Sequence, residues 1–73
     1  MNKKEYLDKY LPKFNFVIQD GDRWLAKKQY KNAIYQYNKA LEYFPNNSLA
    51  KEKLNIAYKE RCKYSNIDCD KVN

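Results

Sequence analysis

Apolar residues recur every three or four positions along most of the chain, which is the spacing of one face of an α-helix. The strongest such run lies between residues 30 and 44. Two further runs lie between residues 13 and 28 and between residues 48 and 62. We therefore predict three helices that each bury one face. The predicted core consists of Phe14, Val17, Gly21, Trp24, Tyr30, Ala33, Ile34, Tyr37, Ala40, Leu41, Phe44, Leu54, Ala57 and Tyr58.

A further short amphipathic helix is predicted within residues 1–12, where two tyrosines and two leucines recur at helical spacing. Pro12 either ends this helix or begins the next one, because proline suits the first position of a helix. Pro45 stops the second main helix, and the polar residues 46–48 offer caps for the third.

The low content of turn residues decides the fold class. One glycine and two prolines leave little room for β-hairpins, so the chain is predicted to be all-α. We expect the short N-terminal helix over residues 1–12, the main helical unit over residues 13–63 and a polar tail over residues 64–73. Seventy-three residues make one small domain or a part of a longer chain.

Aromatic residues make up 16% of the sequence, so the predicted core is built largely from rings. The net charge is +6, but the lysines are scattered along the chain. This scatter favours a solvated basic surface over a dedicated patch for nucleic acid or an anionic membrane. No run of apolar residues approaches the roughly 18 that a membrane span needs, so no membrane insertion is expected.

Small and large side chains alternate in a way that lets two helices approach closely. Small residues at Gly21, Ala33 and Ala40 admit bulky rings at Trp24 and Tyr37 from the facing helix. Together with Pro45, these residues stand at the offsets of a tetratricopeptide repeat, and residues 14–61 resemble one such repeat followed by a capping helix. Asp20 departs from the pattern, because the family has a buried leucine at this position.

The resemblance implies a protein-binding function. Repeats of this family bind a peptide or a helix of another protein in a groove lined by the first helix of each pair. Carried over to this chain, the groove candidates are Asn15, Ile18, Asp22, Leu25, Ala26, Leu49, Glu52, Ile56, Lys59 and Glu60. The subfamily that clamps the carboxyl terminus of a chaperone uses lysine and asparagine contacts. Ile18, Asp22 and Lys53 stand at those positions here, which argues against that ligand.

No residue pattern points to catalysis, a cofactor or a metal. The chain has no histidine, and two cysteines alone cannot complete a zinc site. Asp20 and Asp22 flank Gly21, but side chains two positions apart on a helix point to different faces. No phosphate-binding loop or nucleophile motif is present. We therefore expect neither an enzyme nor a cofactor.

Cys62 and Cys69 allow two interpretations. On one continuous helix they would lie about 10 Å apart along the axis, beyond the reach of a disulfide. Two unpaired thiols are therefore the favoured interpretation. If the helix ends near Tyr64, the chain can fold back and a disulfide becomes possible. The compartment is unknown from the sequence: cytoplasmic by default, and exported if this bond forms.

Three classes of function follow from these observations. The leading hypothesis is a protein-interaction module. The alternative is an assembly module that self-associates through exposed apolar residues, for which Phe16, Tyr43 and Ile56 are candidates. The third is binding of single-stranded nucleic acid by lysines and an exposed ring, with candidates Lys27, Lys28, Lys31, Lys39 and Tyr35.

Overall fold

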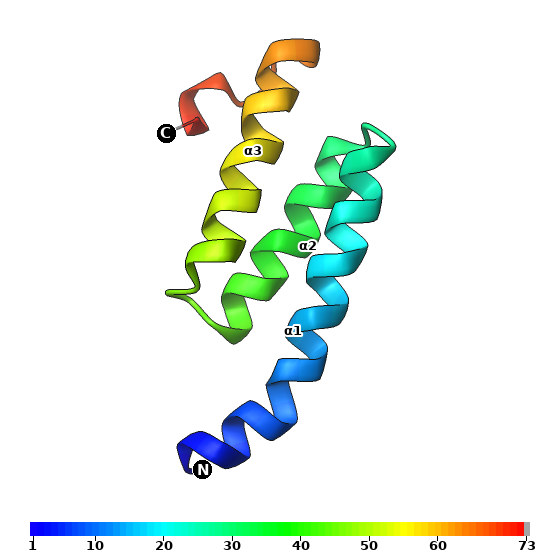
Figure 1. Ribbon diagram of the computed structural model, residues 1–73. Coiled ribbons are helices and arrows are strands. Elements are labelled where there is room, and N and C mark those ends of the chain that lie inside the picture. Colours follow the sequence, from blue (N-terminus) through cyan, green and yellow to red (C-terminus); the bar gives the residue numbers. More distant parts are fainter. Residues whose placement is uncertain (73) are drawn as a thin grey trace.

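The computed structural model describes residues 1–72 and is all-α, which confirms the predicted fold class. Helix α1 spans Lys3–Ala26, α2 spans Tyr30–Tyr43 and α3 spans Ser48–Ser65, followed by a short 3-10 turn, η1, over Cys69–Lys71. Each helix packs against the next one along the chain, α1 against α2 and α2 against α3 (Figure 1). The result is an elongated body of 43 × 22 × 13 Å.

Helix α1 is continuous through Pro12, so the separate helix predicted over residues 1–12 is wrong. Its first turns lean away from the axis of the rest, as expected near a proline, which removes one backbone hydrogen bond (Figure 1). The helix persists because its first turns have tertiary contacts. The Tyr6 hydroxyl donates to the carbonyl oxygen of Tyr43, and the rings of Tyr10 and Tyr43 stack with centroids 5.7 Å apart.

The turns between the helices follow the local sequence. The Asn47 side chain caps α3 by accepting a hydrogen bond of 2.9 Å from the Ala50 amide, as the polar residues before that helix predict. Helix α2 ends at Tyr43, before Pro45. The turn between α1 and α2 places Lys28 in the left-handed region, at a φ of 60°. Helix α3 therefore begins at its predicted cap and α2 ends before Pro45, whereas α1 begins at Lys3, well before Pro12.

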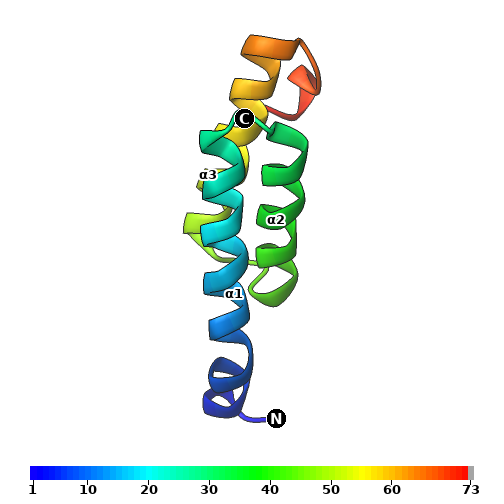
Figure 2. The same cartoon turned by 90° about the vertical axis from the view of Figure 1, so that its right-hand side faces the viewer.

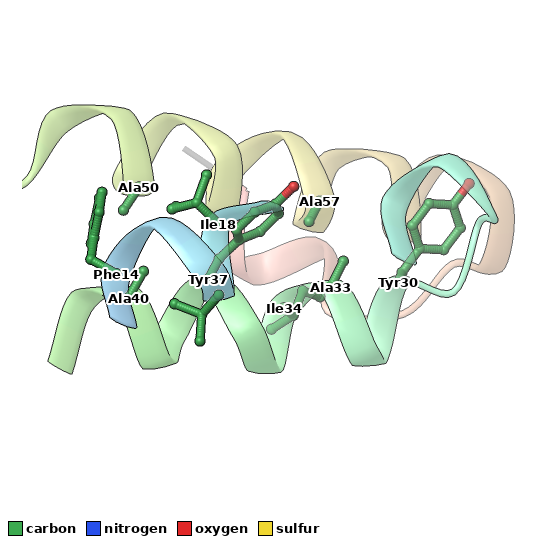
Figure 3. Close-up of a cluster of buried hydrophobic side chains, with 10 residues drawn as sticks. Phe14, Ile18, Tyr30, Ala33, Ile34, Tyr37, Ala40, Ala50 and Ala57 are labelled. Atoms are coloured by element: carbon green, nitrogen blue, oxygen red, sulfur yellow. The ribbon is translucent and has the colours of Figure 1, made fainter. Parts of the chain in front are cut away.

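The core lies where the three helices meet. Figure 3 shows the Tyr37 side chain pointing from α2 toward the other helices, beside Ile18 of α1 and Ala57 of α3. Tyr37 is fully buried. Every residue of the predicted core except Gly21 is an apolar side chain that is buried or packed against the buried cluster, and Gly21 is itself buried. The prediction omitted two buried residues, Ile18 and Ala50.

Gly21 of α1 lies directly against the Tyr37 ring of α2. A methyl group at this position would lie 2.5 Å from Cε1 and 2.8 Å from Cδ1 of Tyr37, which is well inside van der Waals contact. The ring is enclosed on all sides and has no room to withdraw. Gly21 is therefore required by the position of the Tyr37 ring.

The chain after α3 folds back on that helix. Asn66 ends α3 in the left-handed conformation, and Cys62 and Cys69 form a disulfide with their Cα atoms 4.8 Å apart. The favoured interpretation of two unpaired thiols is therefore wrong. The helix ends within one residue of Tyr64, which was the condition for a bond to form. Residues 66–72 are therefore joined to α3 by a covalent bond instead of forming a free tail.

We predict that Gly21→Leu destabilises the protein by about 3 kcal/mol or more, because the added side chain forces α1 away from the Tyr37 ring. Ala26→Leu, on an exposed position of the same helix, adds the same kind of side chain and should change the stability by less than about 0.5 kcal/mol. Urea unfolding followed by circular dichroism measures both values. Equal stability of the two variants would contradict the observed pairing of α1 with α2.

Candidate functional site

One carboxylate joins the three helices. Asp22 of α1 accepts a hydrogen bond of 2.5 Å from the Tyr37 hydroxyl of α2. The Lys53 ammonium of α3 donates to both Asp22 oxygens, at 2.9 and 3.0 Å. The Asp22 side chain is 44% exposed, so this junction lies at the surface while the Tyr37 ring beneath it is buried. Burial, and next the hydrogen bond to Asp22, raise the pKa of Tyr37 above its ordinary value.

A second carboxylate joins α1 to α2. The Asp20 side chain is only 10% exposed and accepts hydrogen bonds from the Gln36 amide at 2.6 Å and from the Trp24 indole at 3.0 Å. It also forms an ion pair with Arg23. The hydrogen bond from Gln36, with those from Trp24 and Arg23, lowers the pKa of Asp20 against the opposing effect of burial. These donors explain how a carboxylate is accommodated where the resemblance implies a leucine.

Four of the ten predicted groove residues line one depression beside Asp22. This depression has a volume of about 420 Å³ and is lined by Asp22, Leu25, Ala26, Lys28 and Glu60. It therefore joins the last turns of α1 to the C-terminal half of α3. Lys28 is the one lining residue that the sequence did not include among the groove candidates.

A row of predicted groove residues follows the exposed surface of α3. Leu49, Glu52, Ile56 and Lys59 recur at intervals of three and four, so they share one face of the helix. Leu49 is 48% exposed and Ile56 is 39% exposed. We call this row, together with the depression beside Asp22, the α1–α3 face. It offers separated apolar side chains among charged ones.

Two groove candidates lie elsewhere. Ile18 is buried in the core with 7% exposure, so its assignment to the groove is wrong. The reason is that α1 packs against α2 while Asp22 also reaches Lys53 of α3, which widens the buried stripe of α1. Asn15 is exposed but does not line the depression.

A further hollow lies at a place that the sequence pattern does not indicate. It has a volume of about 510 Å³ and lies between the first turns of α1 and the turn that joins α2 to α3. Its lining residues are Lys3, Tyr6, Leu7, Tyr43, Phe44, Pro45, Asn46 and Asn47. The apolar character of residues 6 and 7 is visible in the sequence, but their packing partners are about 37 residues away. No local spacing indicates that contact.

The lysines suggested for nucleic-acid binding do not gather around a single aromatic ring. Lys27 lies 5.6 Å from the ring centroid of Trp24, Lys28 lies 5.0 Å from that of Tyr64, and Lys39 lies 5.9 Å from that of Tyr35. Within residues 1–72, no group of three or more acidic or cysteine side chains is placed to hold a metal ion. Across the same residues, none of the helices combines the length and apolar character that a membrane span requires.

Comparison with known proteins assigns neither a family nor a function to the chain. No protein-family model, curated protein or solved structure matches the chain. The candidate site therefore rests on the geometry of the residues themselves.

We predict that Tyr37→Phe lowers the free energy of unfolding by about 1–3 kcal/mol at pH 7, because the variant loses a hydrogen bond to a charged acceptor. The raised pKa of Tyr37 stabilises the fold fully below about pH 10, the value of an unfolded tyrosine, and this stabilisation is lost as the pH rises further. The difference in free energy of unfolding between the parent protein and Tyr37→Phe should therefore shrink above pH 10.

Urea unfolding at several pH values tests this, with Tyr35→Phe as the control, because Tyr35 is 63% exposed. The control should match the parent protein at every pH. A Tyr37→Phe deficit that stays constant up to pH 11 would argue against the role assigned to the hydroxyl.

Proposed function

We propose that the chain is a protein-interaction module that binds a peptide or a helix of another protein on the α1–α3 face. The observation that carries this proposal is the exposure of Leu49 and Ile56 in one row of α3, beside a depression that α1 completes. Leu49 and Ile56 lie two turns apart on one face of α3 with polar residues around them, and a partner helix or peptide can use such side chains as anchors.

The rigidity of this face supports the proposal. The Asp22 junction ties α1 to α3, and the Tyr37 hydroxyl ties the same carboxylate to α2. The packing of the buried Tyr37 ring sets the separation of α1 and α2 at this face, and the partly exposed ion pair adds the position of α3. A preorganised surface loses less conformational entropy on binding than a mobile one.

The resemblance to a tetratricopeptide repeat gives a second line of support. In that family the first helix of each pair lines the binding groove, and α1 and α3 take those places here. Three helices offer only a short groove, so a single module should bind in the micromolar range or more weakly.

Peptides selected from a displayed random library on the intact protein provide the test. We predict that Ile56→Glu weakens binding of the selected peptides at least about tenfold, because it places a charge within the row of α3. Tyr35→Glu, on the exposed part of α2, should leave the affinity unchanged. Peptides that respond to Tyr35→Glu and ignore Ile56→Glu would place the binding surface on α2 and refute the proposal.

A second candidate function is self-association, which the exposure of Phe16 favours. This ring is 66% exposed and lines a hollow of about 430 Å³ between α1 and α2. Tyr43, which the sequence also suggested for this role, is half-buried against Tyr10.

Light scattering over a hundredfold range of concentration distinguishes the two functions. If self-association occurs through this ring, the mass should rise with concentration in the parent protein and stay monomeric in Phe16→Asp. A parent protein that is monomeric throughout would exclude this second candidate.

A further inference from the structure

Residues 66–72, which we call the strap, lie back along the C-terminal half of α3. Two residues in the left-handed region, Asn66 at a φ of 56° and Asp68 at 57°, reverse the chain direction. Figures 1 and 2 show the strap returning beside α3 in both views. The disulfide between Cys62 of α3 and Cys69 of the strap joins the two segments covalently.

The strap reaches one side of α3 through Lys71. Lys71 of the strap lies 5.8 Å from the ring centroid of Tyr58 and lines a hollow of about 380 Å³ with Lys51, Leu54, Asn55 and Tyr58. Leu54 and Tyr58 are half-buried, and they stand one turn apart on the helix. We call this side of α3 the Leu54/Tyr58 face. It is distinct from the α1–α3 face that carries Leu49 and Ile56.

A further contact between described residues joins the strap to α3. Arg61 and Asp68 form an ion pair of 2.7 Å, with side chains that are 20% and 26% exposed. Partly exposed ion pairs and a single cation–π contact contribute little. Ordering seven backbone residues has an opposing entropic cost of roughly 1–2 kcal/mol per residue before contacts are counted. The covalent bond therefore decides whether the strap stays in place.

The three-helix core does not depend on the strap. The fully buried residues Ala33, Tyr37, Ala40, Ala50 and Ala57 belong to α2 and α3, and the strap contributes none of the buried side chains. The junction of Asp22 with Tyr37 and Lys53 also lies outside the strap. Release of the strap should leave the packing of α1, α2 and α3 intact.

We propose that the strap is a redox-released cover of the Leu54/Tyr58 face. A small dithiol attacks the exposed Cys69 sulfur as a thiolate, and Cys62 leaves as a thiolate that takes up a proton. The second thiol of the reductant then displaces Cys69. Two electrons and two protons pass to the protein, the reductant becomes a cyclic disulfide, and the strap leaves α3 with two free thiols at Cys62 and Cys69.

Hydrogen exchange of the intact chain, with and without a dithiol reductant, tests this proposal. We expect the Lys71 and Val72 amides, which donate backbone hydrogen bonds within the strap, to exchange at least about tenfold faster after reduction, while the amides of α1 and α2 change by less than about twofold. The double variant Cys62→Ser/Cys69→Ser should reproduce the reduced pattern without reductant. In NMR spectra, the Tyr58 ring resonances should shift both in the reduced parent protein and in the double variant.

The variant Arg61→Ala distinguishes the effect of the disulfide from the effect of the Arg61–Asp68 ion pair. In the oxidised protein this variant should keep the strap protected, because the disulfide remains. Loss of strap protection in oxidised Arg61→Ala would overturn the proposal, since the ion pair would then decide. Unchanged protection after reduction, or unfolding of α1 and α2 on reduction, would equally overturn it. Unchanged protection after reduction would show that the strap stays in place without the disulfide. Unfolding of α1 and α2 would show that the disulfide stabilises the whole fold.

Discussion

The structure depends on the contact between the Tyr37 ring and the bare backbone at Gly21. This contact sets the separation of α1 and α2, because any side chain at Gly21 would occupy the volume of the ring. The same ring carries the hydroxyl that binds Asp22, so the spacing of the helices also fixes the position of that carboxylate. Lys53 then brings α3 to the same point. Hydrophobic packing and polar pairing thus act through one side chain.

Two carboxylates near a small core would ordinarily weaken it, because burying a charge without partners is unfavourable. Here each carboxylate has several donors, and these donors come from more than one helix. Asp20 and Asp22 therefore contribute to the specificity of the packing, since a shift of one helix would leave a charged group with fewer partners. Much of the apolar packing sets rings and branched side chains against alanines and one glycine, which tolerate little sliding in any case.

Helical periodicity predicted the core well, because side chains such as Tyr37 and Ala40 lie on a face that local spacing defines. It failed at three places where distant contacts decide the outcome. Pro12 remains inside α1 because the rings of residues 6 and 10 pack against the end of α2. Ile18 is buried because α1 has neighbours on two sides. The disulfide forms because the backbone of Asn66 turns back, which spacing along a continuous helix cannot reveal.

The packing of each helix on its neighbour in the chain also bears on how fast the protein folds. Most of the burial joins segments that are close in sequence, so little loop entropy is lost before favourable contacts form, and helical topologies of this kind fold in about microseconds to milliseconds. The hairpin of α1 and α2 has the shortest connection and the tightest interface. The contact of Tyr6 with Tyr43 closes a loop of 37 residues and is expected to form later. The first turns of α1 therefore gain their tertiary contacts only from the far end of α2, although they come first in the chain.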